Sequence, residues 1–177
     1  MNKKIRNYQI FSIVFTLILG TILHFTYEWS EENMIVAIFS AINESTWEHL
    51  KLVFFPMLIT TIIGYYYLGK EYSNFLCSKT KGILVAISFI IIFFYTYTGI
   101  LGKNIAIIDI SSFFIATIIG EISAYLFILN KAKCNKSTSI IILITLFICF
   151  IIFTFKTPKI GLFRDPVTGE YGILKNK

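Results

Sequence analysis

Two histidines and three glutamates lie close to two apolar runs, and these residue types are metal ligands. His24 and Glu28 are four residues apart near the end of the first run, so they project from one face of a helix. Glu44, Glu48 and His49 lie together at the start of the next run. Neutral imidazole and carboxylate groups bind zinc, manganese and iron. The spacing therefore indicates a site for one of these divalent metals.

Helix geometry limits which of these side chains can bind one ion. At about 100° per residue, Glu44 and Glu48 lie about 40° apart around a helix axis, whereas Glu48 and His49 lie about 100° apart. A regular helix therefore cannot present all three groups to one metal. Two ligand sets stay open. One consists of His24, Glu28, Glu44 and Glu48, with His49 either behind these ligands or facing a substrate; the other consists of His24, Glu28 and His49.

A bound metal with an open coordination position would permit hydrolysis by a metal-activated water. Glu44 or Glu48 would then act as the general base, with His49 beside the substrate. Glu48 also has a purely structural explanation, because Ser45 and Glu48 form the S-x-x-E capping box of a helix N-terminus. Helix capping would explain Glu48, but it would not explain why both histidines lie at the same depth in the membrane.

Glu121 lies well inside a later apolar run, next to Gly120 and Ser123. An ionisable group at that depth is costly, and such groups usually face a bundle interior or a cavity. Two interpretations stay open: a proton or ion pathway, or a protonated carboxyl hydrogen-bonded to a Tyr, Ser or Thr of a neighbouring helix.

The C-terminal segment contains LFRDPVTGEYG, which is typical of a tight turn. Asp165 and Pro166 begin this turn, and Gly169 permits a positive φ. Arg164 is the natural partner of the glutamates on the same side of the membrane, and Tyr171 can reach the same pocket. We expect either a cover over that pocket or an ordinary solvated tail.

The composition excludes a water-soluble domain. Of 177 residues, 56% are hydrophobic and 15% are charged, and the mean hydropathy is +0.74. The apolar runs are about 20 residues long, the length that crosses a bilayer. We predict one all-α domain over residues 1–177, a polytopic membrane bundle with an external tail at 156–177. Its five transmembrane spans are about 8–27, 47–68, 83–101, 105–129 and 140–155.

A sixth, shorter helix is expected between the first two spans. The segment from Glu31 to Ala41 is too short to cross the membrane and too apolar for a solvated loop. Ser30 can cap a helix there, with Glu31 and Glu32 complementing the dipole of its first turn. We predict an interfacial or re-entrant helix on the external face.

The basic residues predict the orientation. The N-terminus and the two connections on its side contain Lys3, Lys4, Arg6, Lys70, Lys79, Lys81, Lys131, Lys133 and Lys136, whereas the short connections on the other side contain only Lys103. By the positive-inside rule, we expect a multi-pass cell-membrane protein with a cytoplasmic N-terminus and an external C-terminus. The basic residues of the tail favour the reverse.

The net charge and the cysteines limit the kinds of partner that we expect. The net charge of +6 comes from these membrane-flanking residues, so it gives no reason to expect nucleic acid as a partner. Cys77, Cys134 and Cys149 show no CxxC spacing, and we expect them to be reduced. The expected partners are the lipid bilayer and a small polar or cationic ligand. The sequence does not indicate the oligomeric state.

Two motifs carry a family resemblance. The block Asn43-Glu44-Ser45-Thr46-Trp47-Glu48-His49 and the tail pattern LFxDPxTGxYG resemble an uncharacterised family of small bacterial integral membrane proteins. The resemblance implies a polytopic architecture and brings no known activity with it.

Three functions stay open. The leading hypothesis is an external pocket of histidine and glutamate that binds a divalent metal or a small polar ligand, as in a metal-dependent membrane hydrolase. The second is a small-solute transporter or substrate-capture subunit, which needs Glu121 and the external pocket on one pathway. The third is a non-catalytic scaffold that uses its tail for partners. Whether the protein is an enzyme is not decided by the sequence.

Overall fold

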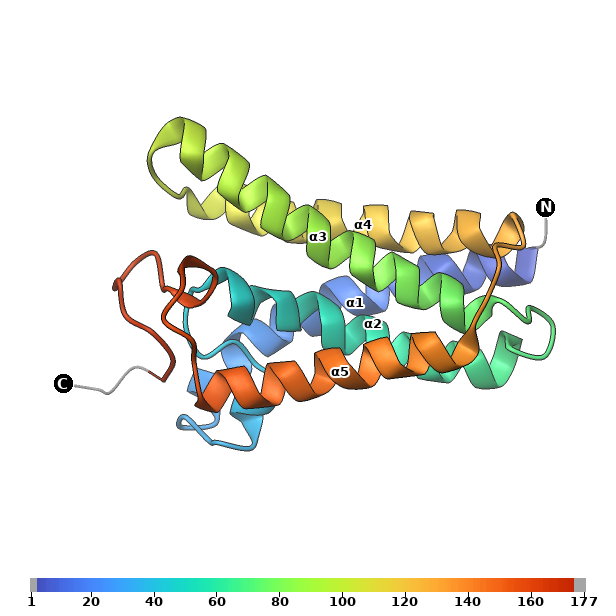
Figure 1. Ribbon diagram of the computed structural model, residues 1–177, viewed down its shortest axis with the longest axis horizontal. Coiled ribbons are helices and arrows are strands. Elements are labelled where there is room, and N and C mark those ends of the chain that lie inside the picture. Colours follow the sequence, from blue (N-terminus) through green and yellow to red (C-terminus); the bar gives the residue numbers. More distant parts are fainter. Residues whose placement is uncertain (1–2, 174–177) are drawn as a thin grey trace.

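The computed structural model describes residues 3–173, which form a bundle of five long helices with antiparallel neighbours (Figure 1). The helices are α1 (Lys3–Trp29), α2 (Thr46–Leu68), α3 (Phe75–Leu101), α4 (Ala106–Leu129) and α5 (Lys136–Phe155). Each is long and apolar enough to cross a membrane, and no strand is found within residues 3–173, so the predicted all-α class with five spans is confirmed. The predicted tail extends to 177, and its last four residues lie outside the described part.

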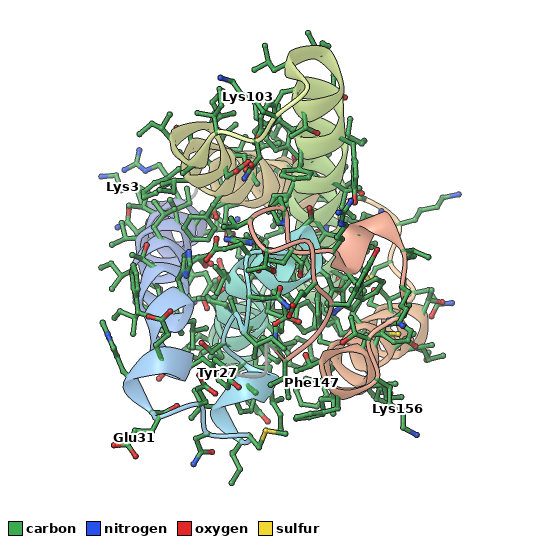
Figure 2. All side chains as sticks on the ribbon, turned by 90° about the vertical axis from the view of Figure 1, so that its left-hand side faces the viewer. Lys3, Tyr27, Glu31, Lys103, Phe147 and Lys156 are labelled. Carbon is green, nitrogen blue, oxygen red and sulfur yellow. A yellow bond between two sulfur atoms is a disulfide. The ribbon has the colours of Figure 1, made fainter. Side chains whose placement is uncertain are left out.

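The two ends of the bundle differ. One end, here called the site end, contains the last turns of α1, α3 and α5 and the first turns of α2 and α4; it lies on the left in Figure 1. Figure 2 looks onto this end, where Glu31, Lys103 and Lys156 project from the periphery and the tail lies across the middle. The other end is called the far end.

On α1, the face that packs against the bundle is more polar than the face that points outward. The buried face of α1 includes Gln9, Ser12, Thr16 and Gly20, whereas large apolar side chains of the same helix are exposed. In a bilayer, apolar side chains gain nothing by leaving the hydrocarbon, so small and polar residues occupy helix interfaces. This arrangement fits a multi-pass membrane protein.

The hairpin of α3 and α4 shows the same rule. A Cβ added to Gly82 would lie 2.5 Å from the carbonyl oxygen of Gly120, and one added to Gly120 would lie 2.7 Å from that of Gly82. Ala86 and Ala124 lie beside these glycines. Only residues without a larger side chain permit such close backbones.

The short helix predicted from Glu31 to Ala41 is largely absent. Its only helical turn within the described residues is the 3-10 turn η1 (Val36–Ile38). Glu31 and Glu32 do not begin a helix but end α1: both have positive φ (54° and 60°), and their amides donate to the carbonyls of Glu28 and Tyr27. The prediction was wrong here because Ser30, the expected N-cap, belongs to the end of α1: its amide donates to the carbonyl of Thr26 and its hydroxyl to that of Tyr27.

Two expectations at the far end were also wrong. Cys77 and Cys134 form a disulfide, with Cα atoms 5.5 Å apart, whereas reduced cysteines were expected; Cys149 is free. Lys79, counted above as a loop residue, lies in α3 and is fully buried. The helix begins eight residues before the predicted span, at Phe75.

Candidate functional site

Three of the predicted ligands meet at the site end. His24, Glu44 and His49 each offer one ligand atom, and these three atoms lie within 4.8 Å of one another. Nε2 of His24 is 3.9 Å from Oε1 of Glu44, and Nε2 of His49 is 3.4 Å from Oε2 of the same carboxylate. We call these residues the His–Glu cluster. Neither of the two predicted ligand sets matches this cluster in full. Within residues 3–173, the cluster combines His24 and Glu44 of the first set with His49 of the second, and it contains neither Glu28 nor Glu48.

Glu44 can join His49 because it does not belong to the helix. Helical spacing would separate the two side chains only if both residues were helical, but α2 begins at Thr46 and Ser45 is its N-cap, in an extended conformation. The Oγ atom of Ser45 accepts from the amide of Glu48 (3.4 Å), as the capping motif predicts. Glu44 therefore precedes the first turn, and helical spacing does not constrain its direction.

The backbone fixes the ring of His49. Its Nδ1 atom is 3.0 Å from the carbonyl oxygen of Ser45, one turn earlier. A carbonyl only accepts, so Nδ1 carries the proton in this hydrogen bond. In the neutral ring the lone pair then lies on Nε2, the atom that faces Glu44. Orientation of a ligating histidine through its second nitrogen is a common feature of metal sites.

Glu48 has a different set of partners. It is buried and forms an ion pair with Lys51, and its Oε2 accepts from the amide of Ile42 (3.2 Å). Lys51 is also buried; it donates to the carbonyl of Ala37 (2.8 Å) and to the hydroxyl of Thr154 (3.1 Å). Pairing makes both buried charges tolerable. The pair thus ties the loop before α2 and the end of α5 to α2.

A pocket of about 460 Å³ adjoins the cluster, and we call it the lateral pocket. It lies between α1, α2 and α4, and all three residues of the His–Glu cluster line it, together with Asn104 and Asp109. Asp109 accepts a hydrogen bond from the hydroxyl of Tyr97. We had not placed Asp109 in the site. The short connection between the third and fourth runs indicates that Asp109 lies at the same end of the bundle, but not that it lines the same pocket.

Glu28 lies nearby but lines another space. It borders a pocket of about 290 Å³ together with His24, Glu44 and Asp165. Glu28 is thus close to two members of the cluster without belonging to it.

The tail folds over the cluster through Asp165, which is buried. Its Oδ1 accepts from the amides of Val167 (2.7 Å) and Thr168 (3.1 Å), which closes the predicted turn. Its Oδ2 accepts from the amide of Glu44 (3.3 Å). In addition, the amide group of Asn43 donates to the carbonyl of Gly172 (2.8 Å). The tail is therefore attached to the two residues that precede the helix cap.

Apolar contacts hold the same segment. Phe163, in the 3-10 turn η2 (Gly161–Phe163), packs against Trp47, with ring centroids 4.8 Å apart. Arg164 and Tyr171 form an isolated antiparallel bridge, and Arg164 Nε donates to the carbonyl of Gly169 (3.3 Å). Arg164 thus contacts the tail itself, and Tyr171 packs against the aromatic core that contains Trp47.

Glu121 is fully buried near the far end and forms an ion pair with Lys79 of α3, with an Nζ–Oε2 distance of 2.6 Å. The hydroxyl of Ser12 on α1 donates to Oε1 (2.7 Å), and the side chain of Gln9 donates to the backbone carbonyl of Glu121 (2.8 Å). The sequence suggested a hydroxyl partner, which Ser12 provides, but not the lysine. Glu121 thus links α1, α3 and α4, and it is not part of the His–Glu cluster.

Comparison with known proteins identifies a matching family, and the function of that family is unknown. A family model described as a family of unknown function (DUF6512) matches residues 1–173. No curated protein and no solved structure matches the chain.

Proposed function

The chain belongs to the DUF6512 family, and from the geometry at the site end we propose that it binds one divalent metal ion through His24, Glu44 and His49. The observation that carries the proposal is the orientation of His49, whose Nδ1 is bonded to a carbonyl while Nε2 faces a carboxylate oxygen at 3.4 Å. A lone pair facing a carboxylate is repulsive unless a metal ion or a proton lies between them, and a metal ion would also bind the nearby Nε2 of His24.

The ligand set is compatible with zinc. Two ligand atoms about 2.0–2.1 Å from a tetrahedral zinc ion are about 3.3–3.4 Å apart. The distance between His49 Nε2 and Glu44 Oε2 is 3.4 Å, whereas the 3.9 Å between His24 Nε2 and Glu44 Oε1 would have to shorten on binding. Two histidines and one glutamate are also a ligand set of catalytic zinc sites. Manganese and iron accept the same ligands.

The proposed reaction class is hydrolysis. Three protein ligands leave one position of a tetrahedral ion for water, and zinc lowers the pKa of that water to about 7. The lateral pocket gives a substrate access to this position, and Asp109 in the same pocket is suited to accept the proton. Glu44 would serve as a ligand rather than as the general base, and the buried ion pair of Glu48 makes it unsuited to that role.

The metal content of the purified protein tests the proposal. Wild-type protein, prepared in mild detergent without a histidine tag or chelator, is compared with His49→Ala, Glu44→Gln and the exposed control Glu31→Gln. We expect about one metal per chain in wild type and control, and loss in the two cluster variants. A wild-type protein that stays empty after incubation with zinc, manganese and iron would refute the proposal.

The two alternative functions receive less support. An ion pathway through Glu121 is disfavoured because its carboxylate already has Lys79 and Ser12 as partners. A scaffold that offers its tail to partners is disfavoured because Phe163 and Asp165 are buried against the chain's own helices.

A further inference from the structure

The lateral pocket is polar at one end and apolar at the other. Helices α1 and α4 run antiparallel in a register that pairs Ser12 with Glu121 and Gly20 with Phe113. One turn closer to the site end, the same register pairs His24 with Asp109, and both line the pocket. Because four residues of helix rise about 6 Å, the polar groups lie about that much nearer the membrane surface than the apolar groups.

The apolar half is formed by side chains of α2 and α4. Leu52 of α2 lines it from the centre of the bundle, and Ile110, Phe113 and Phe114 line it from α4. No charged residue lines the pocket below the level of His24 and Asp109 within the described part of the chain. A fully water-soluble ligand would leave the side chains of this apolar half without an apolar group to pack against.

The pocket is bordered by the surface that faces lipid. Phe25 on α1 and Ile110 on α4 line it and are 42% and 52% exposed. On the side of the aqueous phase, Val167 of the tail also lines it. The hydrocarbon is therefore the natural source of a ligand.

We infer that the lateral pocket binds a membrane lipid, with an oxygen-bearing head group at the His–Glu cluster and a hydrocarbon chain against Leu52, Ile110 and Phe113. The lipid enters between α1 and α4 from within its own leaflet. This inference rests on the proposed metal site, because the head-group oxygen takes the open position of the ion. The volume of about 460 Å³ is within the usual range of ligand sites, and it accommodates a head group and part of one chain.

A photoactivatable phospholipid tests the inference. Protein in nanodiscs of phosphatidylglycerol, doped with a phosphatidylglycerol that carries a diazirine in its acyl chain, is irradiated, and labelled peptides are mapped by mass spectrometry. Three proteins are compared: wild type, Ile110→Trp, which fills the pocket, and Ile107→Trp. Ile107 is an exposed residue of the same helix that does not line the pocket, so it is a matched control. Metal content is measured on each sample.

We expect labels at Leu52 and Phe113 in wild type and Ile107→Trp, and about tenfold less in Ile110→Trp, since excluding two methylenes costs about that factor in affinity. Equal labelling of these residues in all three proteins, or none in wild type, overturns the inference. Soluble glycerol 3-phosphate is added as a competitor; if it abolishes the labelling, the ligand is a water-soluble phosphate and the inference also fails. If one of these contradicting results is obtained with protein that has its full metal content, the lipid inference fails but the proposed metal site is still supported.

Discussion

The backbone amide of Glu44 donates a hydrogen bond to Oδ2 of Asp165, a residue 121 positions later in the chain. Glu44 is the member of the His–Glu cluster that lies between the two imidazoles, and it has no helix of its own to hold it. Its position therefore depends on the tail.

Replacement of Asp165 tests this dependence. Asp165→Ala removes the acceptor of three backbone amides, and each bond to a carboxylate contributes about 1.5–3 kcal/mol. We expect the unfolding free energy in detergent to fall by about 2 kcal/mol or more, together with weaker metal binding. Glu170→Gln, an exposed residue of the same turn, is the control and is expected to match wild type. Unchanged metal affinity in Asp165→Ala would show that the tail does not position Glu44.

Glu48→Gln separates a structural role from a ligand role. The variant leaves Lys51 buried without its counter-charge, which typically costs about 3–5 kcal/mol. We expect a large loss of thermal stability and an unchanged metal content in the protein that remains folded. The double variant Glu48→Gln with Lys51→Met is expected to recover much of the stability. Loss of metal from folded Glu48→Gln would instead identify Glu48 as a ligand.

Glu121→Gln is expected to destabilise the far half of the bundle by a similar amount, because Lys79 is fully buried. Unfolding in detergent, followed by circular dichroism, measures the effect. Glu71→Gln is the matched control, since Glu71 pairs with Lys4 at the surface and such pairs contribute about 1 kcal/mol or less. If Lys79→Met added to Glu121→Gln restores no stability, the buried charge is not the cause.

The orientation in the membrane has its own test. The basic residues still predict that the far end is cytoplasmic, although Lys79 no longer contributes to that count and a disulfide at this end favours an oxidising compartment. In a cysteine-free background, we expect Lys103→Cys at the site end to react with a membrane-impermeant maleimide in intact cells, and Lys131→Cys to react only after lysis. The reverse pattern would place the site end in the cytoplasm.

Much of the fold could be predicted because its signal is local. Runs of about 20 apolar residues fix the number of helices without any knowledge of their packing. The boundaries were less accurate where polar residues belong to a helix: Lys79 looked like a loop residue, but its charge is compensated by Glu121, 42 residues later. No local pattern shows such a pairing.

Part of the candidate site could also be predicted, because some of its signal is local in the sequence. The positions of His24 near the end of one apolar run and of His49 at the start of the next correctly suggested that they lie at one level, and their ring centroids are 5.2 Å apart. It could not distinguish Glu44 from Glu48, because that choice depends on where α2 begins and on Lys51 as a buried partner of Glu48. Asp109 was missed because it comes from a helix hairpin whose position relative to α1 only the packed structure gives.

The bond from Glu44 to Asp165 also sets an order of events during biosynthesis. A ribosome releases the first two helices long before it reaches the tail, and domains acquire structure from the N-terminus onward as they are made. His24, Glu44 and His49 are thus all synthesised early, but Glu44 gains its tail partner only after α5 and the segment that follows have been translated. The cluster would be completed last, so an unfinished chain in the membrane would not yet hold a properly positioned metal site.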